Sequence, residues 1–259
     1  MPVGVYIPGS SLLHQMNAAG KLVCLFLLLA AIVMTDSLWG YALLSGCMVV
    51  IVKLAGLTFQ NAVRPVAGLK LFLVLIFVMN ASFFSTKQVL WAWWIFHVSV
   101  EGMMQGANVV LRVSLLMVLA NVLTSVTSPI ELTGAVETLL WPLHLLGIPV
   151  GDVAMILSVA LQFIPVFMEE AEMIQKAQIA RGARFESRRL LERAASMMPL
   201  VVPVFLAAFR RADELSAAME ARGYRRAKGR TRRLKEPFGY KDVAAFAISG
   251  GICLVQILL

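Results

Sequence analysis

Apolar runs separated by short polar breaks form the main pattern along this chain. A membrane-spanning helix needs about 20 mainly apolar residues. Three runs are clear candidates by this measure, namely Val66–Phe84, Gly106–Val126 and Val243–Leu259. The pattern therefore predicts at least three membrane-spanning helices.

Two shorter apolar runs, Leu22–Thr35 and Ser37–Val52, lie on either side of Asp36. Because each run is short for a span, we predict a tight hairpin of two helices with Asp36 at the turn. Lys21 and Lys53 then lie at one membrane face, where their aliphatic stems can extend to the interface. The prediction is about five transmembrane helices in all.

Two further apolar runs, 153–168 and 197–209, lie within region 130–240. If both crossed the membrane, the two arginine-rich stretches that follow them would lie on opposite sides, which the positive-inside rule disfavours. The second run also contains Pro199 and Pro203, which break or kink a spanning helix. We therefore expect helices laid against the membrane on its cytoplasmic side.

The local pattern of this region is helical. Ser128 fits an N-cap, Pro129 the first helical position and Glu131 the first turn. Further along, apolar residues recur at the three, four and seven spacings of one helix face, at Phe205, Ala208, Phe209, Ala212, Leu215 and Met219. We predict an amphipathic helix with this face packed and its charged face in water.

These elements predict an all-α integral membrane protein in three regions. Residues 1–127 form a membrane region of four helices, residues 128–240 a cytoplasmic helical region with two long amphipathic helices, and residues 241–259 a C-terminal transmembrane helix. The four spans before residue 128 and the one after 240 leave the whole basic region on one side of the membrane.

Composition and charge sharpen this assignment. The chain is 59% hydrophobic and 15% charged, well away from the balance of soluble domains. Its net charge of +8 is uneven, because 17 of the 23 lysines and arginines lie between Lys176 and Lys241. Positive charge of this kind marks the cytoplasmic side of a membrane protein.

A short internal repeat lies within this basic region. The tripeptides Ala180-Arg181-Gly182 and Ala221-Arg222-Gly223 are 41 residues apart. One interpretation is a pair of ordinary helix C-termini, with glycine in a left-handed conformation and arginine at the negative end of the helix dipole. The same geometry also holds a charged, planar guanidinium at an exposed tip, so each tip is a candidate docking plug.

The chain as a whole resembles the transmembrane T component (EcfT/CbiQ-like) of energy-coupling factor (ECF) transporters. The matching stretches include "RVSLLMVLANVLTSVTSPIELTGAVETLLWPLHLLGIPV", "LSVALQFIPVFMEEAEMIQKAQIARGARF" and "RRADELSAAMEARGYR". The N-terminal stretch "YIPGSSLLHQMNAAGKL" also matches, although "NAAGK" stands where the family often has an Asp-Pro-Arg-type turn.

The resemblance implies a non-catalytic coupling subunit of an ABC importer in the cell inner (plasma) membrane. Its arginines, Arg181 and Arg222, would dock into two ABC-type ATPase subunits, or a homodimer of one, with Ala180, Gly182, Ala221 and Gly223 shaping the tips. A separate membrane S component would capture the substrate, a vitamin or a transition-metal ion.

The sequence offers little sign of nucleotide, metal or nucleic-acid binding. The sequence has no GxxxxGKS or GxxxxGKT phosphate loop, and its three histidines and three cysteines lack metal-type spacing, so we expect no cofactor and no metal site. Glu172 and Lys176 have the spacing of a helix ion pair. The basic run that begins at Arg222 has only Tyr224 as an interleaved aromatic residue and favours anionic membrane lipid over nucleic acid.

Two alternatives stay open at this point. A membrane enzyme needs clustered carboxylates or histidines at the membrane face, and none is visible in the sequence. A self-contained membrane carrier or channel for a small solute predicts charged or broken spans in matched halves. The spans contain only Lys70 and Arg112 as charges, and Arg112 fits either a structural anchor or a contact with a partner.

Overall fold

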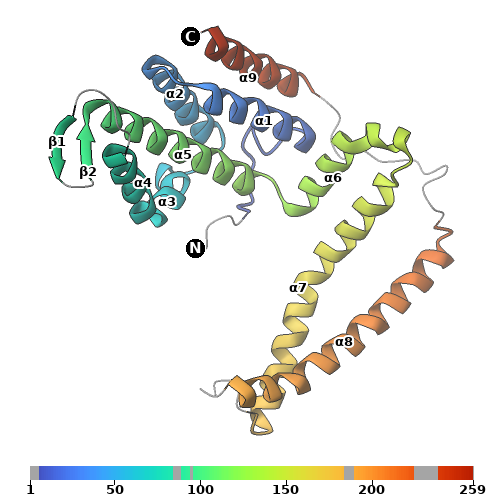
Figure 1. Cartoon of the computed structure of the whole chain (residues 1–259). Helices are drawn as coiled ribbons and strands as arrows, with labels where there is room; N and C mark the ends of the chain where they lie inside the picture. Colours follow the sequence, from blue (N-terminus) through green and yellow to red (C-terminus); the bar gives the residue numbers. More distant parts are fainter. Residues whose placement is uncertain (1–5, 84–88, 94–95, 184–189, 225–238, 259) are drawn as a thin grey trace. The chain divides into compact units, whose positions relative to one another are not determined.

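The computed structural model describes residues 6–83, 89–93, 96–183, 190–224 and 239–258 (Figure 1). The chain divides into two compact units. Unit 1 comprises Met1–Thr138 and Leu234–Leu259, and unit 2 comprises Leu139–Arg233. The predicted all-α membrane fold is confirmed, with one short two-stranded hairpin as its non-helical element in the described part of the chain.

Unit 1 contains most of the helices. In chain order its elements are α1 (Ala18–Met34), α2 (Leu38–Leu54), α3 (Phe59–Gly68), α4 (Lys70–Phe83), β1 (Val89–Trp93), β2 (Phe96–Ser99), α5 (Val100–Val126), most of α6 (Pro129–Leu140), and α9 (Tyr240–Leu258). The strands β1 and β2 are antiparallel. Unit 2 contains the 3-10 helix η1 (Trp141–Leu146), α7 (Val150–Ala180) and α8 (Leu190–Ala221).

The candidate spans largely follow the predicted runs. By length and composition, α5 and α9 can each cross a membrane, and α1 and α2 are apolar helices of 17 residues each on either side of the predicted turn at Asp36. The run Val66–Phe84 is not one straight helix, because α3 and α4 meet at a 60° bend. The α7 helix also meets the length and composition criterion, so this criterion alone does not separate it from the spans.

A proline and an asparagine explain how the bent pair is held. Pro65 lies inside α3 and has no N–H group, so the carbonyl of Asn61 loses its usual helical partner. The side chain of Asn121 in α5 supplies one, donating to the Asn61 carbonyl at 3.0 Å and to the Ala62 carbonyl at 3.2 Å. In an apolar surrounding a free carbonyl is costly, so this contact fixes α3 against α5.

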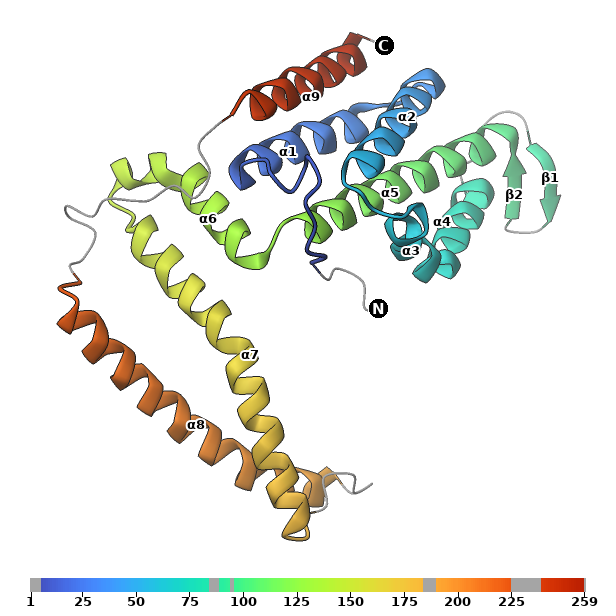
Figure 2. The same cartoon turned by 180° about the vertical axis from the view of Figure 1, so that it is seen from behind.

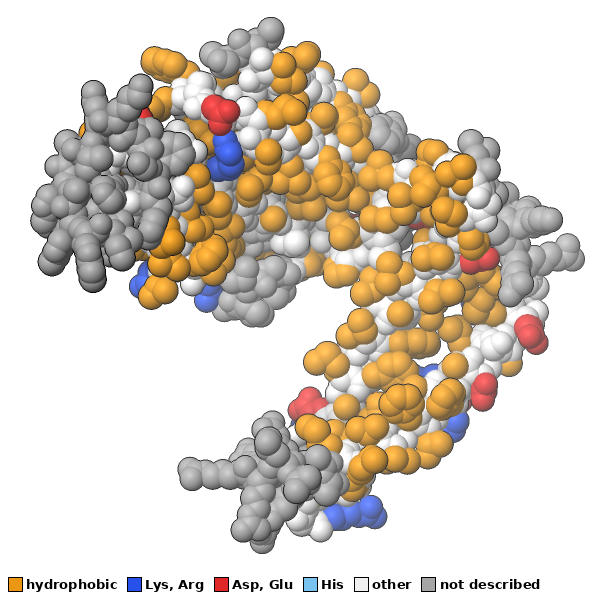
Figure 3. Space-filling model, viewed as in Figure 1, with side chains coloured by type: hydrophobic (Ala, Val, Ile, Leu, Met, Phe, Trp, Pro, Cys, Tyr) orange, Lys and Arg blue, Asp and Glu red, His pale blue; other side chains and the backbone are white. Residues whose placement is uncertain are grey.

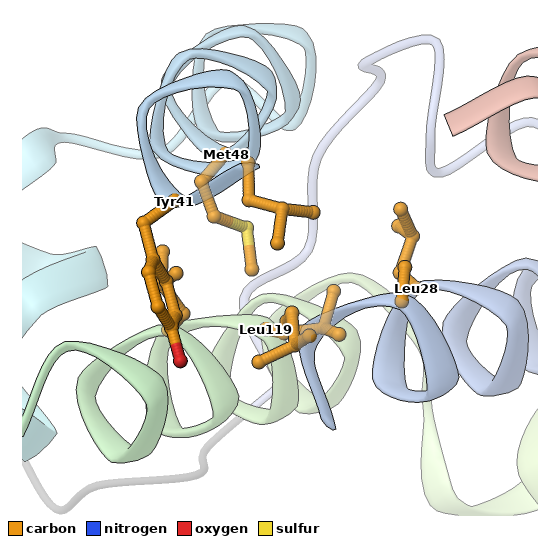
Figure 4. Packing of buried hydrophobic residues seen from close by; sticks show 8 residues of the cluster. Leu28, Tyr41, Met48 and Leu119 are labelled. Carbon is orange, nitrogen blue, oxygen red and sulfur yellow. The ribbon is translucent and has the colours of Figure 1, made fainter. Parts of the chain in front are cut away.

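The core of unit 1 lies where α1, α2 and α5 meet (Figure 4). Leu28 comes from α1, Tyr41 and Met48 from α2, and Leu119 from α5. The α9 helix lies beside α1 in both ribbon views (Figures 1 and 2). Segments from the two ends of the chain therefore close one bundle.

Two glycines let α5 approach α4 closely. A Cβ at Gly102 would lie 3.0 Å from the carbonyl oxygens of Asn80 and Ala81, and one at Gly106 would lie 3.1 Å from the Phe77 carbonyl oxygen. Small residues at helix contacts are typical of membrane bundles, where packing rather than water exclusion drives association.

In unit 2, α7 and α8 form a long antiparallel hairpin (Figures 1 and 2). Of the two expected effects of Pro199 and Pro203, a broken or a kinked helix, the break does not occur, since α8 passes through both. Each proline removes only one intrahelical hydrogen bond, and a helix of 32 residues retains the others.

The packed face of α8 agrees with the predicted one only in part, since Ala208, Leu215 and Met219 are half-buried but the two phenylalanines are not. Phe205 and Phe209 are 60% and 65% exposed and lie against each other, with ring centroids 6.4 Å apart. Ala207 is buried instead, and Arg211 on the same side of the helix reaches α7. Apolar residues cover more than one face of α8, so their spacing alone did not select the face that packs.

Candidate functional site

The first Ala-Arg-Gly tripeptide ends α7 in a Schellman motif. Gly182 has a left-handed backbone with φ of +91°. Its N–H donates to the Ile179 carbonyl at 2.9 Å, and the Ala183 N–H donates to the Gln178 carbonyl at 3.0 Å. These two bonds satisfy carbonyls that the end of a helix leaves free.

The second tripeptide ends α8 in the same way. Gly223 has φ of +69°, its N–H donates to the Glu220 carbonyl at 2.9 Å, and the Tyr224 N–H donates to the Met219 carbonyl at 2.9 Å. The prediction that both repeats are glycine-capped helix ends is confirmed. Their likeness extends from the three letters to the hydrogen-bond pattern.

Both tips are open to solvent. Arg181 and Arg222 are exposed, and no atom lies within 4 Å of a Cβ built on Gly182 or Gly223. Within the described residues, neither arginine has an ion pair with another side chain. Each guanidinium lies at the negative, C-terminal end of its helix dipole and is available to an acidic group of a partner.

The two tips lie at opposite ends of the helical hairpin (Figures 1 and 2). This follows from the antiparallel course of α7 and α8. At a rise of 1.5 Å per residue, the 32 residues of α8 extend over about 48 Å. Two arginines on arms of this length can engage two separate sites.

Ion pairs lie along the hairpin. Nε of Arg211 in α8 lies 3.6 Å from Oε2 of Glu170 in α7, and Lys176 pairs with Glu172 at 2.7 Å, as the spacing predicted. The hydrogen bond from Lys176 lowers the pKa of the Glu172 carboxyl. The Arg211–Glu170 contact was not predicted, because it depends on which faces of the two helices meet.

Arg112 is a structural anchor within unit 1. Its guanidinium donates to the Thr35 carbonyl at 2.6 Å, to the Asp36 carboxylate at 2.9 Å and to the Tyr41 hydroxyl at 3.1 Å. Thr35 Oγ1 in turn donates to Gln256 of α9 at 2.9 Å. The network joins α5, the α1–α2 turn and α9, and so favours the first of the two roles left open for Arg112.

The described residues contain no candidate metal site. No three or more histidine, cysteine, aspartate or glutamate side chains come together in this part of the chain. His14 lies 2.6 Å from Ser11 Oγ and 3.0 Å from the Ile7 carbonyl, a local packing role. The side chains of His97 and His144 lie outside the described residues.

Apolar side chains cover the outside of α7 and α8 (Figure 3). Ile156 of α7 is 70% exposed and Met168 is 68% exposed. Continuous exposed apolar surface of this kind marks contact with a membrane or another protein. Unit 2 is thus a helical hairpin with an apolar surface and an exposed arginine at each end.

These features define the class: a multi-pass α-helical membrane protein with an extended helical hairpin. Residues 9–232 match the cobalt transport protein family CbiQ. The chain is 41% identical over 252 residues to the energy-coupling factor transporter transmembrane protein EcfT of Brevibacillus brevis, covering 95% of this chain and 93% of that protein. It is 38% identical over 249 residues to EcfT of Ruminiclostridium cellulolyticum, covering 95% and 92%, and 36% identical over 247 residues to EcfT of Bacillus subtilis, covering 94% and 92%.

The chain belongs to the CbiQ family and is an EcfT/CbiQ-like transmembrane component of ECF transporters. The predicted family is confirmed. The named relatives are transport components rather than enzymes.

Proposed function

We propose that this chain is the non-catalytic coupling subunit of an ECF-type importer in the plasma membrane. In this proposal the exposed arginines Arg181 and Arg222 dock into two ATPase subunits, and the membrane bundle passes their motion to a substrate-capturing S component. The substrate, a vitamin or a transition-metal ion, is selected by the S component.

One observation carries the proposal: the two repeats end two long helices with the same capping geometry and the same free arginine. A helix cap needs the glycine, not the arginine. Two equivalent arginine tips match two equivalent binding sites, one on each of a pair of ATPase subunits or on each subunit of an ATPase homodimer. ATP hydrolysis is assigned to these partners because the sequence lacks a phosphate-binding loop.

The test substitutes the arginines singly and together. Removing an arginine from a desolvated pairing leaves its acidic partner unmatched and typically costs about 2–5 kcal/mol. We expect Arg181→Ala and Arg222→Ala each to lower uptake, and the double variant to release the ATPases or uncouple hydrolysis from transport. Arg→Lys at either position should restore little, because an ammonium cannot form the bidentate contact.

Arg210→Ala is the matched control, since Arg210 is an exposed arginine of α8 outside the repeat. Uptake, copurification of the ATPases and abundance in the membrane are measured for every variant. Normal assembly and transport by the double variant at equal abundance would show that the arginines have no docking role.

A second experiment tests on which side of the membrane the segments that follow α7 and α8 lie. Single cysteines near residues 186 and 228, in a cysteine-free background, should both be labelled by an impermeant thiol reagent from the cytoplasmic side only. The outcome is informative because α7 is long and apolar enough to cross. Labelling of the two positions from opposite sides would show that α7 and α8 span the membrane, and the coupling arrangement would be wrong.

A further inference from the structure

A half-open cavity of about 360 Å³ lies in unit 1 between α1, α2, α5 and α9. This volume is in the range of small-molecule binding sites. Most of its wall is aliphatic, including Leu28 of α1, Ile51 of α2, Leu119 of α5 and Ile252 of α9. Nothing in the proposed coupling function uses this space.

The charged groups of the cavity gather at one end, whereas the polar Ser249 lies further along α9 with its hydroxyl donating to the Ala245 carbonyl. Lys21 lies near the start of α1, Lys241 near the start of α9, and Thr127 directly after the end of α5. These helix ends meet because α1 and α9 run parallel: Asn17 N–H donates to Asp242 near their starts, and Thr35 donates to Gln256 near their ends. The α5 helix runs the other way, since Arg112 in its first half reaches Asp36.

One of these polar groups lacks a partner. The Thr127 side chain is buried, at 4% exposure, and its Oγ1 makes no hydrogen bond within the described residues. An unsatisfied buried hydroxyl is costly and marks a position where a ligand acceptor fits. Thr127 is one of the residues that line the cavity, so an occupant of the cavity can supply that acceptor.

At this end the two lysines outnumber the one carboxylate, Asp242, so a surplus positive charge is left that suits an anion. The Lys241 ammonium donates to the neutral Gln15 side chain at 2.7 Å, and the Lys21 ammonium donates to the His14 carbonyl at 3.2 Å. Both carboxylate oxygens of the neighbouring Asp242 accept backbone N–H groups, from Asn17 and Gly239. Two lysines and a hydroxyl donor thus face one end of an otherwise apolar space.

The length of the space fits one leaflet. The lining residues of α9 run from Lys241 to Ile252, which is about 16 Å at 1.5 Å per residue. This is about half of the 30 Å hydrocarbon core of a bilayer. A polar end at the headgroup level and an apolar space one leaflet deep together describe a phospholipid.

We propose that this cavity binds one acyl chain of an anionic phospholipid, with the phosphate at Lys21, Lys241 and Thr127. The lipid is a structural ligand that fills the space between α9, α2 and α5 beside α1. The site is independent of the arginine tips, so it stands or falls separately from the coupling function.

The test uses the full-length chain, purified and delipidated in detergent. Phosphatidylglycerol or phosphatidylcholine with identical acyl chains is added back, and binding is followed by native mass spectrometry together with thermal unfolding. We expect one phosphatidylglycerol per chain, a clear preference over phosphatidylcholine, and a raised unfolding temperature with the anionic lipid. Equal binding and equal stabilisation by the two lipids would overturn the proposal.

Two variants, each with a matched control, locate the site. Lys241→Gln should lower the preference for the anionic lipid about fivefold, because one lysine contributes about this factor to the binding of an anionic lipid. Lys53→Gln, at the end of α2 and outside the cavity, should leave the preference unchanged. Ala245→Phe fills the cavity and should abolish the one-to-one complex, whereas Ala247→Phe on the exposed side of α9 should leave it intact. Equal binding by the two phenylalanine variants would contradict the site.

Thr127→Val separates a ligand contact from a fold contact. Because the hydroxyl has no partner in the described structure, the delipidated variant should unfold at the parent's temperature or above. It should nevertheless lose part of the stabilisation by phosphatidylglycerol. A variant that is less stable without lipid, or that responds to lipid like the parent, would show that the hydroxyl serves the fold rather than a bound phosphate.

Discussion

Among the described residues, unit 1 has a buried apolar core beneath an exposed apolar surface, whereas unit 2 has almost no core. In unit 1, Ile32 and Ala31 are at most 1% exposed inside a cluster drawn from three helices. In unit 2, Ile156 of α7 and Phe209 of α8 are 70% and 65% exposed. Unit 1 also exposes large apolar side chains, such as Trp39 and Leu71 at 80% each, so the two units differ in how much apolar surface they bury, not in whether they expose it.

The difference shows what completes each unit. Unit 1 makes its own contacts, through aliphatic packing, close helix approach at glycines and polar crosslinks between helices. The two long helices of unit 2 touch mainly each other, so their remaining apolar surface needs a membrane or a partner protein. The docking proposal places the charged tips at the ends of this incomplete surface.

The largest expected effect concerns the polar crosslinks. Arg112→Met removes three hydrogen bonds that join α5 to the α1–α2 turn. Because hydrogen bonds to charged groups are worth about 1.5–3 kcal/mol, we expect unfolding in detergent at clearly lower temperature, with a loss of about 3 kcal/mol. The matched change in unit 2, Arg211→Met, removes one part-exposed contact of 3.6 Å and should cost at most about 1 kcal/mol. Equal losses would erase the contrast between the units.

A smaller effect is expected for apolar packing. Leu119→Ala should cost about 2 kcal/mol, the low end for a buried leucine, since detergent shields the leucine in the unfolded state too. Phe209→Ala, at a 65% exposed position, should change stability of the isolated chain by no more than about 0.5 kcal/mol. Thermal unfolding followed by tryptophan fluorescence compares the two. A large loss from Phe209→Ala alone would mean that unit 2 buries this ring after all.

The smallest effect is expected at the helix caps. Gly182→Ala and Gly223→Ala place a Cβ on a left-handed backbone, which costs about 1–2 kcal/mol locally, although the space around each is open. We expect faster amide exchange at Ala183 and Tyr224 and an unchanged global unfolding temperature. Gly68→Ala, also in open space but without a positive φ, is the control and should leave exchange at its helix end unchanged. Protection that survives at both tips would show that the Schellman bonds do not depend on glycine.

Features set by near neighbours were predictable from the sequence. The tips at Arg181 and Arg222 follow from glycine and arginine at a helix end. The start of α6 follows from Ser128 and Glu131, whose side chains and backbone N–H groups bond reciprocally at 3.2 and 3.3 Å. The turn at Asp36 and the membrane class follow from apolar run lengths. Each of these depends on contacts within about five residues, or on composition alone.

Features set by distant neighbours were decided by the tertiary structure. The partners of Arg112, the donation from Asn121 to the carbonyl freed by Pro65, and the packing of Ala207 rather than Phe209 all depend on how one helix is rotated and shifted against another. The distance between the two arginine tips depends on the antiparallel turn between α7 and α8. A linear pattern gives the faces of a helix, but which face meets which neighbour is settled only when all helices compete for the same contacts.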